Sequence, residues 1–333
     1  MSVTFTRRRV LRAALLACGA AGAGLATPAA LAQAAWPDKP VRIIAAGPAG
    51  ATADMAARIL ADALGKEGGQ PVIVDPRPGA GGALAVNELS QAPHDGYTLL
   101  VAVNSLVSEI PHIIKLKVDM AREIAPVAEL GRGGLVLVGN PELPARDFAQ
   151  LKTWIKGKPG AVSYASYSAG TLSHVLGLQL NKAAGLDMTH VGYKGSTPAL
   201  TDVMGGHVPL MFDGIPSSLP LIRAGKVRAY AISSPQRSPL LPDVPTFTEL
   251  GYPQLQATGW MGLWVKPDVP AAQQARLRET VLKLMGQPAL RAKLQELGFE
   301  PGQPRTQEEL ARSLQADYKR MGEVLKSIDF KAE

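Results

Sequence analysis

The chain has 333 residues, with 35 Lys+Arg, 28 Asp+Glu and a formal net charge of +7. Four arginines and no acids fall within residues 1–32, so the rest of the chain carries about +3, which argues against a nucleic-acid-binding protein with clustered basic residues. The single cysteine, Cys18, lies in the same leader, which excludes disulfides, thiolate nucleophiles and cysteine-ligated metals from the remainder.

Residues 1–32 have the pattern of an export signal, with basic residues first and a long uncharged stretch after them. We expect cleavage after Ala32, with Ala34 as the alternative, and residues 6–12 are similar to the twin-arginine export motif. An uncleaved membrane anchor and a lipoprotein attached at Cys18 are the competing interpretations. The leader predicts a protein of the bacterial periplasm.

Strands and helices alternate at the start of the mature chain. Their order predicts a βαβαβ unit with a parallel sheet and right-handed crossovers. The strands are expected at Val41 to Ala46, Val72 to Asp75 and Tyr97 to Val103, and the helices at Asp54 to Leu64 and up to about Ser90.

The same order of elements returns later in the chain. The strands are expected at Val162 to Ala165, Met188 to Val191 and Val208 to Phe212, and the helices at Thr171 to Ala184 and Thr197 to Met204. Both copies have Ala-Gly just before the first helix, at Ala49-Gly50 and Ala169-Gly170. This repetition predicts two α/β lobes, each with a mostly parallel sheet flanked by helices.

Two chain crossings are expected to join the lobes, with a hinge at residues 137–140 and 255–259. The first lobe would comprise residues 36–138 and 259–333, and the second lobe residues 139–258. After the returning strand, Gly259 to Val265, the chain is predicted to be helical, at Ala271 to Met285, Pro288 to Leu297 and Glu308 to Ser327, the last with a capping box at Thr306 and Glu309.

The loops after the first strand of each copy are the candidate ligand site. In open parallel sheets ligands lie beyond the carboxyl ends of the strands, where backbone amides at helix N-termini favour a negative group. Small residues let those amides approach a ligand closely. The candidate ligand-binding residues are Ala49, Gly50, Ala51, Thr52, Asp54, Ser105, Ser166, Tyr167, Ala169, Gly170, Thr171, His174, Tyr193, Gly195, Ser196 and Asp213.

Several side chains near these loops have two interpretations. Asp54 either stabilises the dipole of its helix and pairs with Arg58, or bonds the preceding loop so that the loop amides point outward. His174 is a ligand contact or a helix-surface histidine. Lys194 is expected to be a solvated loop charge, and Trp260 a core residue.

Known catalytic patterns are missing from the sequence. It contains no Gly-x-Ser-x-Gly elbow, His-Glu-x-x-His motif or phosphate loop, and its five histidines lack metal-ligand spacing. Residues 79–84 fail the dinucleotide fingerprint at the last glycine. We therefore expect a binding protein that is not an enzyme and has no cofactor or metal. The alternatives are a secreted hydrolase acting through Asp213 or His174 and a receptor that signals to a sensor protein.

Five segments carry a resemblance to a known family. The segments are Arg77 to Gly82 (RPGAGG), Pro93 to Leu99 (PHDGYTL), His190 to Ser196 (HVGYKGS), Pro198 to Asp202 (PALTD) and Leu241 to Thr246 (LPDVPT). With them, the mature chain resembles the Bug family of periplasmic solute-binding proteins, the extracytoplasmic receptors of tripartite tricarboxylate transporters.

The resemblance implies a two-lobed Venus-flytrap fold whose first lobe contains both chain ends. It also implies a small carboxylate held by backbone amides, hydroxyls and waters from residues 49–54 and 166–174, and membrane permease subunits as partners. A monomer is expected. Gly47 stands where the family usually has an aromatic residue, residues 167–171 (YSAGT) replace the usual Ser-Gly-x-Gly-Thr, and Gly192 replaces a usual proline.

Overall fold

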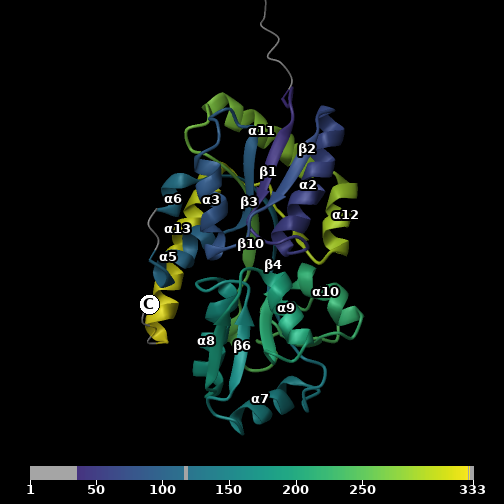
Figure 1. Cartoon of the computed structure of the whole chain (residues 1–333), viewed down its shortest axis with the longest axis vertical. Coiled ribbons are helices and arrows are strands. Elements are labelled where there is room, and N and C mark those ends of the chain that lie inside the picture. Colours follow the sequence, from purple (N-terminus) through teal and green to yellow (C-terminus); the bar gives the residue numbers. More distant parts are fainter. Residues whose placement is uncertain (1–35, 116–118, 329, 331–333) are drawn as a thin grey trace, which may run out of the picture. The chain divides into compact units, whose positions relative to one another are not determined.

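The computed structural model describes residues 36–115, 119–328 and 330 of the chain. The predicted leader, with its cleavage site and both of its alternatives, lies outside the described residues. Among the helices of those ranges, none combines the length and the apolar character needed to cross a membrane. Two sheets organise residues 36–330, and each is the centre of one lobe (Figure 1).

The first lobe is built around a six-stranded sheet with the order β11-β4-β10-β3-β1-β2. Residues 36–133 supply most of it, and residues 259–330 complete it. The first stretch contains β1 (Val41–Ala45), α2 (Thr52–Gly68), β2 (Val72–Pro76), η1 (Ala80–Gly82), α3 (Ala83–Ser90), β3 (Thr98–Val103), α4 (Ser105–Ser108), α5 (Ile110–Ile113), α6 (Met120–Glu123) and β4 (Ala125–Gly133). The second contains β10 (Gly259–Val265), α11 (Ala271–Met285), α12 (Pro288–Glu296), β11 (Glu300–Pro301) and α13 (Gln307–Ser327).

The second lobe is built around a five-stranded sheet with the order β7-β6-β8-β5-β9. Its elements are β5 (Leu135–Gly139), α7 (Phe148–Lys156), β6 (Val162–Ser166), α8 (Leu172–Ala184), β7 (Met188–Gly192), α9 (Ser196–Met204), β8 (Leu210–Gly214), α10 (Ile215–Arg223), β9 (Arg228–Ile232) and η2 (Pro253–Leu255).

The two sheets share one topology, which confirms the predicted two-lobed α/β fold. Three parallel strands, β2-β1-β3 and β7-β6-β8, are the two βαβαβ units expected from the sequence. An antiparallel strand that arrives from the other lobe, β10 or β5, pairs beside them. Because of these added strands, each sheet is mixed rather than mostly parallel.

Alternating residues of the strands enter two separate cores in the first lobe. On β1, Val41, Ile43 and Ala45 join one buried cluster, and Ile44 joins the cluster on the opposite face. This alternation follows from the two-residue repeat of a strand. Helices cover both faces of the sheet, so the ends of the parallel strands are held rigidly where the loops begin.

The chain first crosses between lobes at Gly133–Gly134. β4 ends at Gly133 in the first sheet, and β5 pairs with β8 and β9 of the second sheet from Leu135 onward. The expected boundary at residue 138 and the expected hinge at residues 137–140 therefore fall inside β5. Gly134 suits the crossing because an added Cβ would lie 2.3 Å from the backbone nitrogen of Ser234, just after β9 of the second lobe.

The C-terminal helix α13 contacts both lobes. Its capping box at Thr306 and Glu309 is present, as predicted. Leu310 and Leu314 pack into a core of the first lobe, whereas Met321 and Leu325 pack with Val175 of α8 in the second lobe. Figure 1 shows α13 running along the side of the molecule toward α8. The helix is thus a third link between the lobes, besides the two crossings.

Candidate functional site

A cavity of ≈ 100 Å³ lies between the lobes. We call it the main cavity. Its volume is several times the ~10–15 Å³ that one water molecule needs, so it can hold a small organic molecule. It is lined by Ala46, Gly47, Pro48, Ala51, Thr52, Ala53, Gly79, Gly81, Gly82, Val103, Leu135, Tyr167, Ser168, Thr171, Tyr193, Lys194, Gly195, Ser196, Gly214 and Met261.

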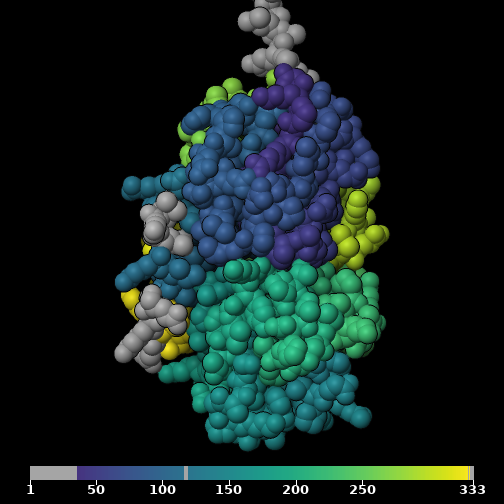
Figure 2. All heavy atoms as spheres, in the orientation of Figure 1, coloured from purple at the N-terminus to yellow at the C-terminus, as the bar shows by residue number. Residues whose placement is uncertain are grey.

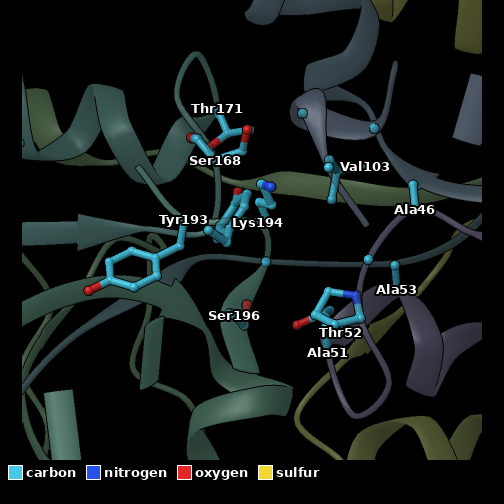
Figure 3. Close-up of a pocket in the computed structure, with 18 of the residues that line it drawn as sticks. Ala46, Ala51, Thr52, Ala53, Val103, Ser168, Thr171, Tyr193, Lys194 and Ser196 are labelled. Atoms are coloured by element: carbon cyan, nitrogen blue, oxygen red, sulfur yellow. The ribbon is translucent and has the colours of Figure 1, made fainter. Parts of the chain in front are cut away.

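Most of the lining residues come from loops at the carboxyl ends of parallel strands in both sheets. Figure 3 shows the labelled residues of the second lobe, from Ser168 to Ser196, facing those of the first lobe, from Ala46 to Val103. Loops follow β1 and β2 on one side, and β6, β7 and β8 on the other. Since all these strands point toward the gap, ligand groups would meet loop backbone from both lobes.

The helix α2 of the first lobe presents an uncapped N-terminus to the main cavity. Its N-cap residue, Ala51, has no side chain able to bond the first amides. The amide of Ala51 itself donates to the Pro48 carbonyl, and that of Gly50 to Asp54 Oδ2 at 2.9 Å. The next amides, of Thr52 and Ala53, belong to the first turn and have no acceptor within the helix. They are available to an anion in the main cavity.

Three helices of the second lobe also begin at the main cavity. The N-cap residues of α8, α9 and α10 are Thr171, Gly195 and Gly214, and none makes a side-chain cap hydrogen bond. All three line the main cavity. The positive ends of four helix dipoles, one from the first lobe and three from the second, therefore meet there, an arrangement that favours a negative group.

The charged side chains of the lining add to this preference. Of the described residues that line the main cavity, Lys194 carries a positive charge and none carries a negative charge. Lys194 was expected to be a solvated loop charge; its side chain is exposed, yet it borders the main cavity (Figure 3). A cation and four helix N-termini without a facing carboxylate make the main cavity an anion site in electrostatic terms.

The two lobes touch around the main cavity. Thr52 Oγ1 lies 3.2 Å from Ser217 Oγ, and Thr197 Oγ1 donates to the Ala49 carbonyl at 3.0 Å. A Cβ on Gly195 would lie 2.2 Å from Cδ of Pro48 on the opposite lobe. Figure 2 shows the blue atoms of the first lobe and the green atoms of the second meeting along a seam. The structure therefore represents a closed form.

Half of the predicted site residues border a cavity. Ser105 lines a smaller, adjoining cavity of ≈ 60 Å³, which we call the side cavity. The residues of the prediction that line the main cavity are Ala51, Thr52, Tyr167, Thr171, Tyr193, Gly195 and Ser196. Figure 3 shows the Tyr193 ring directed away from the first lobe, and its hydroxyl donates to Asp202 Oδ2 at 2.6 Å.

The other predicted site residues lie behind the lining. Asp54 accepts hydrogen bonds from Gly50 N and from Arg58 Nε at 2.9 Å, so it both bonds the preceding loop and pairs with Arg58. His174 Nδ1 accepts from Gly170 N, and the His174 ring stacks on His190 with ring centroids 3.6 Å apart. The predicted residues outside both linings are Ala49, Gly50, Asp54, Ser166, Ala169, Gly170, His174 and Asp213.

Two of the residues behind the lining, Asp213 and His174, are buried titratable groups. Burial raises the pKa of Asp213, and hydrogen bonds from Ser196, Ser217 and Ser218 oppose that rise. Burial lowers the pKa of His174 to about 3, with a smaller contribution from His190. His174 is therefore neutral above pH 4 and can keep accepting the Gly170 amide.

Sequence reasoning did not place the loop after β2 in the site, nor several strand residues that border the main cavity. Gly79, Gly81 and Gly82 line the main cavity, and their glycine-rich loop after a second parallel strand is the signal that could have located them. Apolar residues such as Val103 and Met261 carry no such signal, because a strand residue that borders a cavity has the same composition as one in a core. Trp260, expected in the core, is buried, stacks on Trp264 and borders the side cavity.

A bound metal ion would need side chains that can hold it. In residues 36–115, 119–328 and 330, no cluster of three or more His, Cys, Asp or Glu side chains is placed to hold a metal ion.

The sequence and the fold match a known family. A family model described as the tripartite tricarboxylate transporter family receptor matches residues 56–330. The chain belongs to this receptor family. Among curated relatives of the receptor, BugT of Bordetella pertussis is 36% identical over 247 residues, which cover 73% of this chain and 74% of BugT.

Solved structures of similar proteins extend the comparison. MatC from Rhodopseudomonas palustris, solved with bound malate, is 30% identical to the receptor with a TM-score of 0.81, over 87% of this chain and 100% of MatC. Another R. palustris protein, solved with adipate, is 28% identical with a TM-score of 0.85, over 90% of this chain and 100% of that protein. The periplasmic binding protein BugD is 26% identical with a TM-score of 0.83, over 90% and 100% of the two chains. The receptor is therefore a substrate-binding receptor with the two-lobed fold of these proteins.

Proposed function

We propose that the receptor works in the periplasm as a monomer, closes around a small carboxylate in the main cavity and delivers it to membrane permease subunits. It binds its ligand without transforming it, and it uses no cofactor or metal. The observation that carries this proposal is the convergence of four uncapped helix N-termini, from both lobes, on a cavity whose lining includes Lys194 and, among the residues that the structure describes, no acid.

The similar proteins support a carboxylate as the ligand. MatC was solved with malate and a second R. palustris protein with adipate, and both have carboxylate groups as their charged ends. A carboxylate suits the receptor because its oxygens accept several hydrogen bonds at once from backbone amides.

The predicted site residues divide into two roles under this proposal. Those that line the main or side cavity contact the ligand, mainly through backbone nitrogen. The remaining residues hold the loops in place: Asp54 fixes Gly50, and His174 fixes Gly170. A ligand that bonds loops of both lobes stabilises the closed form over the open form.

A thermal-shift screen of ligand-stripped protein tests the proposal. A ligand that binds the folded form alone adds about 2.7 kcal/mol of stability at a hundred times its dissociation constant. We expect at least one mono-, di- or tricarboxylate to raise Tm by roughly 5 °C under that condition. A uniformly flat screen, in protein verified as folded and ligand-free, would overturn the proposal.

Two alternative functions have their own tests. A secreted hydrolase would need Asp213 or His174 at its substrate, but neither borders the main cavity or the side cavity. A receptor that feeds a sensor protein would be recovered with that sensor rather than with permease subunits, so crosslinking in membranes followed by mass spectrometry separates the two outcomes.

A further inference from the structure

Behind the main cavity, one buried carboxylate collects the hydroxyl hydrogens of three serines. Ser196 Oγ donates to Asp213 Oδ1 at 2.5 Å, whereas Ser217 Oγ and Ser218 Oγ donate to Asp213 Oδ2 at 2.6 and 2.8 Å. Asp213 is fully buried, and the backbone of Gly214 also bonds its carboxylate. Each serine has a single hydrogen, so each of these three hydrogens is committed to the protein.

This commitment fixes the direction of the hydrogen bond between the lobes. Thr52 Oγ1 and Ser217 Oγ are 3.2 Å apart, and either atom could donate on geometry alone. Ser217 has already given its hydrogen to Asp213, or to the Gly214 carbonyl at 3.2 Å. Thr52 must therefore be the donor. Its hydrogen points to the opposite lobe, and its two lone pairs can accept from a group in the main cavity.

Thr52 and Ser196 consequently offer acceptors to the main cavity in the closed form. Both residues line the main cavity, and Thr52 Oγ1 would lie 2.7 Å from a Cβ built on Gly214, which is another lining residue. Ser196 bonds the Asp213 carboxylate directly, and Thr52 is linked to it through Ser217, so the same carboxylate orients both hydroxyls. We call these two oxygens the acceptor pair.

Other hydroxyls of the lining follow the same pattern. Thr171 Oγ1 donates to the Ser168 carbonyl at 2.6 Å, and Ser168 Oγ donates to the Ala169 carbonyl at 3.2 Å. Tyr193 donates to Asp202. The donors left for a ligand are then backbone amides, Lys194 and the hydroxyl of Tyr167, while the oxygens of Thr52 and Ser196 act as acceptors. A bare carboxylate would satisfy the amides and leave the acceptor pair facing a group with no hydrogen to give.

We propose that the receptor selects small carboxylates that also bear a hydrogen-bond donor, an alcohol or an ammonium group, close to the carboxylate. The carboxylate takes the helix-terminal amides, and the donor group bonds the acceptor pair of Thr52 and Ser196. This inference rests on the proposed function and names the chemical class of its ligand.

Calorimetric titration of ligand-stripped protein with matched acids tests the selection. Malate and aspartate differ from succinate only by a hydroxyl and by an ammonium group, and lactate and alanine differ from propionate in the same way. Leaving a buried polar group unpaired costs about 1–3 kcal/mol. In the series whose carbon chain fits the main cavity, the substituted acid should therefore bind about tenfold tighter or more than its parent. Comparing the hydroxy acid with the amino acid of the same series shows whether the acceptor pair binds an alcohol or an ammonium group.

Three variants separate the acceptor pair from general damage. Thr52→Val removes the acceptor with little change in shape. In this variant the substituted acid and its parent should bind with equal affinity. Ser217→Ala frees the hydrogen of Thr52 for the ligand and should narrow the ratio by strengthening binding of the parent acid. Ser218→Ala takes a donor from Asp213 without touching Thr52, so the ratio should stay as in the unaltered protein.

The possible results have distinct meanings. Equal affinity for parent and substituted acids, or a parent acid as the tightest ligand of a broad carboxylate screen, overturns the selection while the proposed function stands. A ratio that persists in Thr52→Val overturns the assignment to this acceptor pair. A folded, ligand-free protein that binds no carboxylate overturns the proposed function, and the inference with it.

Discussion

At the scale of single residues, Gly195 lies at a close contact between the two lobes. Its φ is +118°, and an added Cβ would lie 2.2 Å from the ring of Pro48. Gly195→Ala should destabilise the fold by about 1–3 kcal/mol through backbone strain, and the clash with Pro48 should additionally destabilise the closed form. We expect affinity for the receptor's carboxylate to fall about tenfold or more, as measured by calorimetric titration.

Gly251 offers the matched control for this prediction. Its φ is +85°, and nothing lies within 4 Å of an added Cβ. Gly251→Ala should lower Tm through comparable backbone strain and leave ligand affinity unchanged. An equal loss of affinity in both variants would show that Gly195 acts through general stability rather than through closure.

The buried carboxyl of Glu109 makes stability depend on pH. Burial is the largest cause that raises the pKa of Glu109 from 4.5 to about 7, and hydrogen bonds from Ser105 and Ser108 oppose the rise. A raised folded-state pKa means that the folded form holds the proton more strongly than the unfolded form. Stability from this group is complete below pH 4.5 and is lost as the pH rises through about 7.

Glu109→Gln should remove this dependence. The amide cannot ionise, so the variant should be more stable than the unaltered protein at pH 8, by up to about 3 kcal/mol, and nearly equal at pH 5. Urea unfolding at both pH values measures the difference. The loss of stability below pH 6, where His174 and His190 with lowered pKa must gain protons, should be the same in both proteins. A constant offset at both pH values would contradict the assignment to Glu109.

The sequence identified the loops of the site better than the side chains in them. Thr52 and His174 both stand at the start of a helix beside a candidate loop, and composition does not separate them. Their positions differ because successive helical residues point about 100° apart: Thr52 faces the main cavity, and His174 faces back to Gly170 and His190. Lys194 is exposed, as expected, and nothing in the sequence indicated that it also borders the main cavity, since a lysine at a cavity rim and one in solvent have the same sequence context.

At the scale of elements, α13 offers a comparison between its two ends. Leu314 and Leu325 are similarly buried on this helix, with 6% and 5% exposed, but Leu314 packs in the first lobe and Leu325 reaches the second. Either leucine changed to alanine should lower the free energy of unfolding by about 2–4 kcal/mol. The two variants should differ in how they affect the arrangement of the lobes.

Leu325→Ala alone should shift ligand-free protein toward an open form. Small-angle scattering should give a larger radius of gyration for Leu325→Ala than for Leu314→Ala, with the difference removed by saturating ligand. If both variants scatter alike without ligand, the contact of α13 with α8 does not bias closure.

Elements with clear periodicity were predicted from the sequence, and elements whose signals conflict were not. The two βαβαβ units and the helices α11 and α13 are found within a few residues of their expected bounds. β4 was missed because it is buried along most of its length, so it lacks the alternation of a half-exposed strand. α10 was missed because Pro216 and Pro220 indicate a loop, although Pro216 in the first turn replaces an amide that has no acceptor in the helix.

At the scale of the whole molecule, the duplication of one topology explains why both lobes present helix N-termini to the same gap. In each sheet, the parallel unit points its carboxyl ends toward the other lobe, and the strand that crosses over pairs alongside it. The sequence indicated this arrangement through its repeated strand order. It did not locate the first crossing, because the run Leu135–Gly139 has the composition of a buried strand in either lobe.

The structure of the receptor with the tightest carboxylate from the screen is the most direct test of this account. We predict carboxylate oxygens within about 3 Å of backbone nitrogens from both lobes, at Thr52 or Ala53 and at the start of α8, α9 or α10. A carboxylate held by side chains of one lobe alone, or bound outside the main cavity, would contradict it.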